Sequence, residues 1–494
     1  MRSKKHALRT LHVCSEVFPY LKTGGLADVT AALPLALAKM GCDVRILVPG
    51  FPAFINHIQN QHLVAEWFPR FGAHSLRLFY GTFPQTGLSA YYIDAPGLYD
   101  RPGNPYIDIY GQPYGDNHRR FALLGWVAAR LADGFDFFWR PQIIHGHDWH
   151  AGLTFAYLKV LEQSRNQKLA GTVFTIHNLA YQGNFPRYVF GELDLPHHLF
   201  NLEEMEFYGQ ISFLKSGLVY ADKVTTVSPT YSREIHDGEQ SCGLDGIVRK
   251  RGGDIVGILN GIDTEVWNPS TDDSLFTTYN ARSITGKKRC RLALQQEMGL
   301  HLQDTAPLFC VVSRFASQKG LNLVLGGMSL LLEKGAQIVI VGNGEYHLER
   351  AFSDYAHRNP QQVAVRLGYD ESLAHRVIAG SDVIMIPSRY EPCGLTQFYG
   401  LRYGTLPLVH RVGGLADSVT DSTPENLLQR TATGFTFDHF DISSIEEAIN
   451  RVFALYSRPK EWRMVQRQGM KQQLNWKRSA HEYKKLYDEV VVRR

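Results

Sequence analysis

The sequence predicts an α/β protein built from two doubly wound domains with parallel sheets. Short runs rich in valine and isoleucine alternate with longer amphipathic stretches along the chain, and this alternation is typical of βαβ units. The runs are nearly continuous in apolar residues, as expected of strands buried on both faces. About a dozen such strands are more than a single sheet usually contains. We therefore expect two Rossmann-like domains that face each other across a deep cleft.

The first domain is expected to span residues 1–254. Its strands are predicted at residues 10–16, 43–50, 142–148, 172–178 and 222–228. Between the first two strands, the stretch from Ala32 to Met40 has helical character, and Gly41 ends it because glycine readily takes the conformation that closes a helix.

The second domain is expected to span residues 255–470. Its strands are predicted at residues 254–263, 307–314, 336–344, 363–369, 382–389 and 406–411. The pentapeptide GGLAD occurs at residues 24–28 and again at 413–417, each time after a strand and at the start of a helix. This repeat supports two related halves. Residues 471–494 are expected to form a helix that packs back on the first domain.

Composition narrows the possible functions. The chain has 494 residues, of which 44% are hydrophobic, which excludes disorder as its main state. Lysine and arginine total 52 against 48 acidic residues, a balance that does not indicate a nucleic-acid partner. The six cysteines form no C-x-x-C pair, so we expect a reducing, cytoplasmic setting. Neither a secretory signal nor an apolar run long enough for a membrane span is recognised.

The candidate site residues follow predicted strands, where open parallel sheets bind their ligands. Lys22 and Gly25 belong to a glycine-rich turn before a helix, which could hold a phosphate or be an ordinary turn with a surface lysine. Arg314 and Lys319 lie at a strand-to-helix junction. They could converge on a diphosphate or be two solvated cations.

Histidines and one aspartate gather after two strands of the first half. Residues 145–150 read HGHDWH, and His177 ends a second strand. The spacing matches no established metal motif, so we expect no metal here and assign Asp148 to a sugar hydroxyl or a developing positive charge. His177 has two readings, a packed or surface histidine and a catalytic one.

The segment 388–400, SRYEPCGLTQFYG, combines a carboxylate with a helix start. Free backbone N–H groups at Gly394, Leu395 and Thr396 would favour a phosphate, and Glu391 could accept hydrogen bonds from a sugar. The alternative is a carboxylate that only complements the helix dipole. Cys393 has no obvious base nearby, so we interpret it as a structural thiol.

Taken together, these motifs resemble the bacterial glycogen synthase family, which includes the plant starch synthases. The resemblance runs from about residue 11 to about residue 485 and rests on KTGGLADV, HGHDWHAGL, FTIHNLAYQG, SRFASQKG and PSRYEPCGLTQFYGLRYGTLP. It implies a glycosyltransferase of the GT-B fold that moves glucose from ADP-glucose to the non-reducing end of an α-1,4-glucan such as glycogen. It further implies retention at the anomeric carbon and no metal or other cofactor.

The resemblance also assigns roles to individual residues. It implies that Arg314 and Lys319 neutralise the leaving diphosphate and that Glu391 holds the glucose hydroxyls. The other implied contacts are Lys22 and Gly25 for the nucleotide phosphates, Asp148 and His177 near the anomeric carbon, Cys393, Gly394, Leu395 and Thr396 through their backbone, and Asn260 and Tyr369 as further donor contacts. Many related GT-B enzymes carry a second glutamate eight positions after the first, where this chain has Tyr399.

Three alternatives stay open at this point. The first is a transferase of the same fold with another donor, such as UDP-glucose, or another acceptor. The second is a metal-dependent hydrolase built on HGHDWH. The third is a non-catalytic glucan-binding protein, although a neutral glucan gives such a protein no use for the two cations Arg314 and Lys319.

Overall fold

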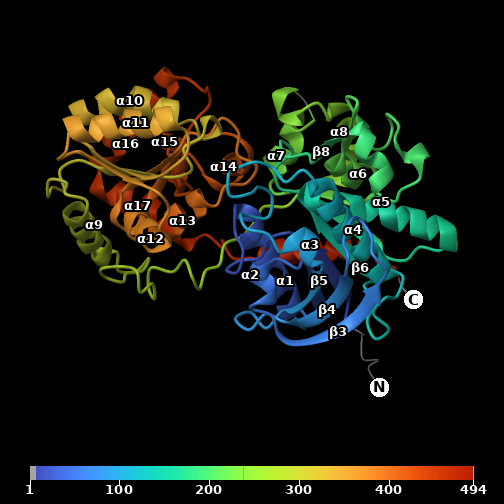
Figure 1. The fold of residues 1–494 in the computed structure, drawn as a ribbon. Coiled ribbons are helices and arrows are strands. Elements are labelled where there is room, and N and C mark those ends of the chain that lie inside the picture. Colours follow the sequence, from blue (N-terminus) through green and yellow to red (C-terminus); the bar gives the residue numbers. More distant parts are fainter. Residues whose placement is uncertain (1–6, 237, 493–494) are drawn as a thin grey trace. The chain divides into compact units, whose positions relative to one another are not determined.

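The computed structural model describes residues 7–236 and 238–492, which divide into two compact units. The first unit comprises Met1–Asn260 with Trp476–Arg494, and the second comprises Gly261–Asn475. Each unit has a parallel sheet and a core of its own (Figure 1).

The first unit is built on a nine-stranded sheet that is parallel from β12 to β5 and ends in an antiparallel hairpin. In sheet order its strands are β12 (Ile255–Gly257), β11 (Lys223–Thr226), β7 (Gly171–Ile176), β6 (Ile143–His147), β1 (Arg9–Val13), β2 (Asp43–Pro49), β5 (Ser89–Asp94), β4 (Leu76–Thr82) and β3 (Gln59–Trp67). The central strands β6 and β7 are buried throughout, whereas the edge strand β3 is mostly exposed.

The strand order of this sheet reverses between β1 and β6. From β1 the chain proceeds outward to β2, and from β6 it proceeds to β7 on the other side. Such a switch point is where open α/β sheets bind ligands. The helices of the unit are α1 (Gly25–Lys39), α2 (Pro52–Ile55), α3 (Pro96–Tyr99), α4 (Asn117–Ala132), α5 (Asp148–Arg165), α6 (Phe213–Tyr220), α7 (Pro229–Glu234), α8 (Asp245–Arg251) and α18 (Lys477–Val490).

Two parts of the first unit differ from the sequence expectation. The hairpin of β3 and β4 was not foreseen, and neither was a small antiparallel sheet of β8 (Asn184–Pro186), β10 (Gln210–Ser212) and β9 (Glu206–Phe207). The strand expected to open the second domain is β12, and it instead pairs in parallel with β11 at the edge of the first sheet. Its few residues complete that sheet, which moves the division of the chain to Asn260.

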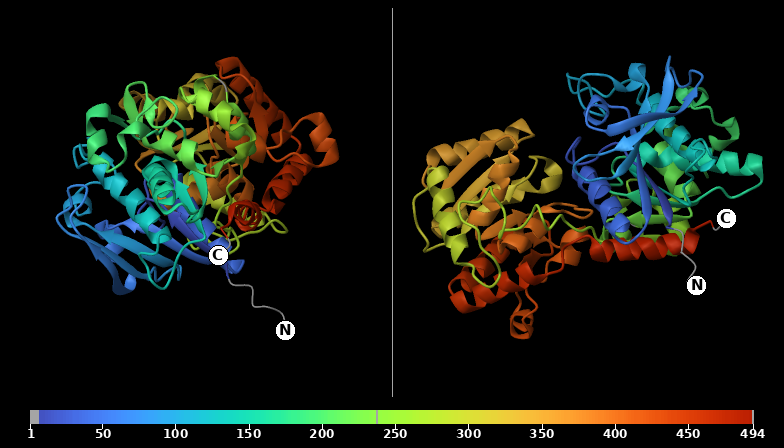
Figure 2. Two further views of the ribbon diagram at one scale, coloured as in Figure 1. Left: turned by 90° about the vertical axis from the view of Figure 1, so that its right-hand side faces the viewer. Right: turned by 90° about the horizontal axis from the view of Figure 1, so that it is seen from below.

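The C-terminal segment forms two helices that belong to different units. The helix α17 (Pro459–Lys471) lies in the second unit, whereas α18 packs beside α1 in the first (Figure 2). Tyr483 and Tyr487 of α18 are buried in a cluster with Leu33 and Leu37 of α1. The hydroxyl of Tyr487 lies 2.7 Å from Nδ1 of His145 in β6. The helix α18 therefore contacts one of the two strands that form the switch point.

The second unit has a six-stranded, fully parallel sheet. In sheet order the strands are β15 (Val363–Leu367), β14 (Gln337–Gly342), β13 (Leu308–Val312), β16 (Val383–Ile386), β17 (Leu406–His410) and β18 (Phe435–Phe437). Numbered along the chain this is the order 3-2-1-4-5-6 of dinucleotide-binding folds, with its switch point between β13 and β16. The predicted α/β class with two Rossmann-like domains is confirmed.

Helices cover both faces of the second sheet. In Figure 1, α10, α11 and α16 lie on one side of it and α12, α13 and α17 on the other. The helices not yet given bounds are α9 (Thr285–Glu297), α10 (Leu321–Glu333), α11 (Tyr346–Arg358), α12 (Glu371–Gly380), α13 (Thr396–Tyr403), α14 (Gly413–Ser418), α15 (Pro424–Gln429) and α16 (Ile442–Tyr456).

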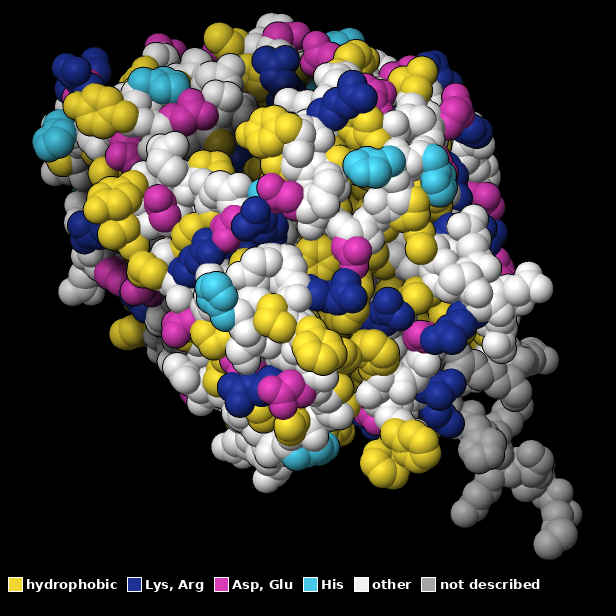
Figure 3. All heavy atoms as spheres, turned by 45° about the vertical axis from the view of Figure 1, so that its right-hand side comes forward, with side chains coloured by type: hydrophobic (Ala, Val, Ile, Leu, Met, Phe, Trp, Pro, Cys, Tyr) yellow, Lys and Arg dark blue, Asp and Glu magenta, His cyan; other side chains and the backbone are white. Residues whose placement is uncertain are grey.

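Two features of the structure concern membranes and nucleic acids as partners. Across residues 7–236 and 238–492, no helix has the length and apolar character needed to cross a membrane. On the face drawn in Figure 3, basic and acidic side chains are interspersed rather than separated. That face therefore lacks the continuous basic stripe by which proteins bind nucleic acid.

Candidate functional site

The switch point of the second unit brings a lysine and a glutamate together. Lys319 follows β13, and Glu391 follows β16, the neighbouring strand. The Lys319 ammonium donates a hydrogen bond of 2.6 Å to Oε2 of Glu391, and the Ser388 hydroxyl donates to the same oxygen at 2.9 Å. Glu391 is only 7% exposed. Oε2 is thus fully engaged, whereas Oε1 has no hydrogen-bond partner among the described residues.

The same pocket contains the start of α13. Gly394, Leu395 and Thr396 line it together with Lys319 and Glu391. Within the described chain, the backbone N–H groups of these three residues donate to no acceptor, as is usual for the first turn of a helix. One cation, one carboxylate and three free N–H groups therefore share a small pocket, an arrangement suited to an anion with a hydroxyl-bearing group beside it.

Two glycines let the loops of this pocket approach each other closely. Gly320 has a φ of +66°, and a Cβ there would lie 1.9 Å from the Pro387 carbonyl oxygen. Gly413, at the start of α14, has a φ of +44° and would meet the Glu391 carbonyl oxygen at 2.0 Å. A side chain at position 320 would push the Lys319 loop away from the loop that follows β16, and one at position 413 would push the start of α14 away from the Glu391 loop.

Arg314 and Tyr369 also lie at the carboxyl edge of this sheet but outside the pocket. Arg314 is exposed, and its guanidinium has no hydrogen bond or ion pair with the described residues. Tyr369 follows β15, is 62% exposed, and its hydroxyl donates to Glu371. Cys393 is buried and does not line the pocket. Of the residues predicted for this half, the pocket therefore unites Lys319, Glu391 and the helix start.

In the first unit a buried glutamate organises the glycine-rich turn. Glu16 follows β1 and is only 2% exposed. Its carboxylate accepts hydrogen bonds from the Thr23 N–H at 2.6 Å, the Thr23 hydroxyl at 2.6 Å and the Gly24 N–H at 3.3 Å. The backbone donors just before α1 are therefore already satisfied by a carboxylate. An incoming anion would find only the donors from Gly25 onward, together with Lys22.

Lys22 and Gly25 keep their exposed positions at the start of α1. The Lys22 ammonium forms an ion pair of 3.0 Å with Asp28 and lies 5.1 Å from the centre of the Phe18 ring. Asn260, at the end of the first unit, is buried, and its side-chain oxygen has no partner among the described residues. A buried, unsatisfied amide oxygen is costly and is consistent with a position that a ligand completes.

Asp148 and His177 meet directly at the switch point of the first unit. The His177 N–H donates to Oδ1 of Asp148 at 2.7 Å. Asp148 begins α5 with a φ of +56°, a strained conformation for a non-glycine residue and one often found at functional sites. Burial raises the pKa of Asp148 to about 7, even though hydrogen bonds from the backbone of His177 and Asn178 oppose the shift.

Behind these two residues lies a cluster of histidine rings. Nδ1 of His12 lies 3.1 Å from Nε2 of His147, and Nδ1 of His147 lies 3.1 Å from Nε2 of His177. His145 bonds through its two nitrogens to the hydroxyls of Tyr487 and Thr175. One ring nitrogen each of His12, His145 and His147 lie within 4.8 Å of one another. Because most of these nitrogens are engaged in hydrogen bonds, the donor set fits a neutral polar core better than a metal site.

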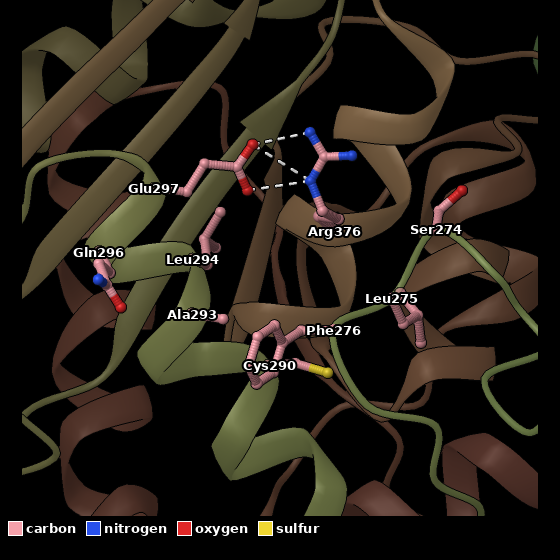
Figure 4. Close-up of a pocket in the computed structure, with 9 residues that line it drawn as sticks. All are labelled: Ser274, Leu275, Phe276, Cys290, Ala293, Leu294, Gln296, Glu297 and Arg376. Atoms are coloured by element: carbon pink, nitrogen blue, oxygen red, sulfur yellow. Dashed lines mark hydrogen bonds and ion pairs between the residues drawn. The ribbon is translucent and has the colours of Figure 1, made fainter.

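A separate pocket of about 420 Å³ lies on the second unit between α9, α12 and the loop before α9 (Figure 4). Its lining includes Phe276, Cys290 and a forked ion pair in which Arg376 donates to both oxygens of Glu297. None of the residues predicted for the site lines this pocket.

Sequence reasoning missed Glu16 and His12. Glu16 had a usable signal, because it is a carboxylate placed directly after a buried strand, the rule that found Asp148. His12 had none, because it lies inside β1 and meets the other histidines only through the register that pairs it with His145.

Comparisons with known proteins agree with this geometry. Residues 9–250 match the starch synthase catalytic domain model, and residues 296–468 match the model of glycosyl transferases group 1. The glycogen synthase of Francisella tularensis subsp. novicida is 54% identical over 485 residues, which cover 98% of this chain and 99% of that protein. The glycogen synthase of Francisella tularensis subsp. holarctica is likewise 54% identical, over 486 residues.

Solved structures give the same result. The catalytic domain of starch synthase IV from Arabidopsis thaliana, bound to ADP and acarbose, superposes with a TM-score of 0.88 at 31% identity, covering 99% of this chain and 100% of that one. Sucrose-phosphate synthase from Thermosynechococcus elongatus, at 17% identity and a TM-score of 0.58, shares the fold. The predicted family is thus confirmed: the chain belongs to the glycogen synthase family, the GT-B glucosyltransferases of glycogen synthesis.

Proposed function

We propose that this enzyme transfers glucose from ADP-glucose to the non-reducing end of an α-1,4-glucan, with retention at the anomeric carbon. The observation that carries the proposal is the pocket at the switch point of the second unit. It combines the Lys319–Glu391 pair with free N–H groups at the start of α13. The related starch synthase structure that holds ADP and acarbose supports both the adenine nucleotide and the glucan.

In this proposal the second unit binds the donor. The diphosphate would lie on the N–H groups of Gly394, Leu395 and Thr396, with Lys319 beside it and the unpaired guanidinium of Arg314 available to the departing charge. The glucose would be held by Oε1 of Glu391, the oxygen that Lys319 and Ser388 leave free. Protein cations then supply the neutralisation that a metal ion would otherwise give.

The first unit supplies the acceptor side of the reaction. Asp148 and His177 are proposed to lie near the anomeric carbon, where positive charge develops as the phosphate leaves. Lys22 and Gly25 would contact the nucleotide phosphates, and Asn260 would add a donor contact. Tyr369 would add another donor contact from the second unit. Because a retaining reaction through an enzyme-bound sugar needs a carboxylate nucleophile about 5 Å from the acid, and no such pair is assigned here, we propose same-face attack, with the leaving phosphate taking the acceptor proton.

The six cysteines form no disulfide bond in the structure. Cysteines without disulfides fit a reducing compartment, so we propose that the reaction takes place in the cytoplasm.

The test is release of nucleoside diphosphate in the presence of glycogen, measured with ADP-glucose and UDP-glucose, each with and without EDTA. The proposal requires glycogen-dependent release of ADP that EDTA does not inhibit. Preference for UDP-glucose would overturn the donor, and inhibition by EDTA would favour the metal-dependent reading of HGHDWH. Absence of release from both donors would favour a glucan-binding protein.

A pair of variants ties the activity to the pocket. Glu391→Gln removes the charge that positions Lys319 and should lower kcat about a hundredfold or more. Glu447→Gln, which changes an exposed carboxylate on α16, is the matched control and should leave kcat unchanged. Equal activities of the two variants would exclude Glu391 from the reaction.

A further inference from the structure

A hydrogen-bonded row of imidazoles runs from the interior of the first sheet to the proposed site. His12 lies in β1, and His147 is the last residue of β6. His147 contacts His12 through Nε2 and His177 through Nδ1, both at 3.1 Å. Because His12 and His147 are fully buried, neither ring has water as an alternative partner. His147 therefore joins a core histidine to a residue of the proposed active site.

Because the rings are neutral, the hydrogen bonds between them must all run in one direction along the row. Burial lowers the pKa of His12 and His177 to about 3 and that of His147 well below its usual range. Each ring is thus neutral at physiological pH, with one N–H and one lone pair. His147 can donate from only one of its two nitrogens, so its two hydrogen bonds must point the same way along the row. Only two proton arrangements satisfy both contacts.

The inner end of the row selects between these arrangements. Nε2 of His12 is buried and has no hydrogen-bond partner among the described residues. In one arrangement this atom carries an N–H group, and in the other it carries a lone pair. In protein interiors, N–H groups without an acceptor are rarer than acceptor atoms without a donor. The favoured arrangement therefore has His12 donating from Nδ1 to His147, and His147 donating from its own Nδ1 to Nε2 of His177.

We propose that His147, backed by His12, is a positioning residue that holds His177 in the tautomer protonated on Nδ1. His177 then meets the substrate as a hydrogen-bond donor through Nδ1, and its natural target is an oxygen atom of a sugar. Asp148 fixes the main chain of His177 through the 2.7 Å bond to its N–H, so backbone and ring are held by different partners. The inference rests on the proposed function only in calling that target a sugar.

The kinetic test replaces His147 by phenylalanine. The His147→Phe change removes both hydrogen bonds but keeps an aromatic ring next to His145, whose ring centre lies 4.2 Å away. We expect kcat to fall about tenfold or more, because His177 loses its fixed donor, whereas KM for the sugar nucleotide should change little. The His12→Phe variant breaks only the distal bond, and a smaller decrease in kcat is expected.

The matched control is His145→Phe. His145 is equally buried on the same strand, but its nitrogens bond to Tyr487 and Thr175 and not to His177. This variant should lower the melting temperature about as much as His147→Phe while kcat stays near that of the unchanged protein. Equal losses of kcat in the two variants would mean that His147 acts only through stability, and would overturn the proposal.

A spectroscopic test needs no turnover. Nitrogen-15 NMR of the histidine-labelled protein distinguishes the two neutral tautomers, and the His177 signal is assigned by its loss in His177→Gln. We expect the Nδ1-protonated form in the unchanged protein and a shift toward the other tautomer in His147→Phe. A proton on Nε2 of His177 in the unchanged protein would overturn the proposal. If the unchanged protein transferred no glucose, the proposed function would fail, but this measurement would still decide the tautomer.

Discussion

Mild acid should destabilise the first unit, because its histidine cluster must remain uncharged to remain buried. The cluster consists of His12, His145, His147, His150 and His177. Burial lowers the pKa of His12, His150 and His177 to about 3, and it lowers the pKa of His145 and His147 well below the usual range. In the unfolded chain each ring would take up a proton at about pH 6.5. Stability should therefore decrease as the pH falls below that value.

The size of the effect follows from proton linkage. Between about pH 7 and pH 5.5, a histidine that is protonated only in the unfolded chain lowers the free energy of unfolding by about 1.3 kcal/mol. His12, His150 and His177 together account for about 4 kcal/mol. Asp148 acts in the opposite direction. Because its pKa is raised to about 7 in the folded state, the folded protein takes up this proton before the unfolded chain does. This raises the free energy of unfolding by about 2 kcal/mol over the same interval. The net loss is about 2 kcal/mol, and His145 and His147 add to it.

His150→Phe isolates one contribution. The ring of His150 stacks on Tyr106 with centres 4.7 Å apart and planes inclined by 22°, and phenylalanine preserves the ring while removing the titrating nitrogens. The pH-dependent loss should shrink by about 1 kcal/mol, which corresponds to about 2–4 °C in melting temperature for a unit of this size. Scanning calorimetry of the whole chain at both pH values measures this difference.

The matched control is His74→Phe, which changes an exposed histidine of the same unit and should leave the pH dependence unaltered. The reasoning fails if the melting temperature of His150→Phe falls between pH 7 and 5.5 as steeply as that of the unchanged protein. That result would mean that the buried ring of His150 takes up its proton in the folded state.

Three further predictions concern single residues. Arg314→Ala should lower kcat/KM about a hundredfold in the ADP-release assay yet leave the melting temperature unchanged, because the guanidinium bonds to no described residue; a large loss of stability would contradict this. Gly320→Ala should destabilise the second unit by about 3 kcal/mol or more in thermal unfolding, since a Cβ would lie 1.9 Å from the Pro387 carbonyl oxygen; near-normal stability would refute the close approach. Asp148 titrates at about pH 7, so kcat/KM should rise with pH through that value, and Asp148→Asn should be less active and flat there; an unchanged profile in the variant would assign the titration to another group.

The pocket around Lys319 and Glu391 could be predicted from the sequence because its residues follow strands that lie side by side. Lys319 comes after β13 and Glu391 after β16, and the strand order of doubly wound sheets places the first and fourth strands together. Their polar side chains therefore had to meet at the carboxyl edge. The fold class followed from the same pattern, because most strands of the second sheet are short apolar runs. The three-residue strand β18 (Phe435–Phe437) was not predicted.

The remaining features depend on tertiary contacts that no local pattern records. The contact of His12 with His147 requires the parallel register of β1 and β6. The assignment of β12 to the first sheet depends on its pairing with β11. A strand of three residues carries no sequence pattern that predicts its partner. The expectation of a phosphate cradle at residues 22–26 was incomplete for a similar reason, since Glu16 takes the Thr23 and Gly24 donors through a buried contact.

The two GGLAD copies show why a repeated motif does not imply a repeated role. In the second copy, a Cβ on Gly413 or Gly414 would lie 2.0–2.1 Å from carbonyl oxygens of the loop that carries Glu391. These glycines are needed for packing. In the first copy, a Cβ on Gly24 would have no heavy atom within 4 Å, and the Gly24 N–H already donates to Glu16. Packing therefore does not require a glycine at position 24. The open space next to its backbone would instead allow a substrate to approach closely.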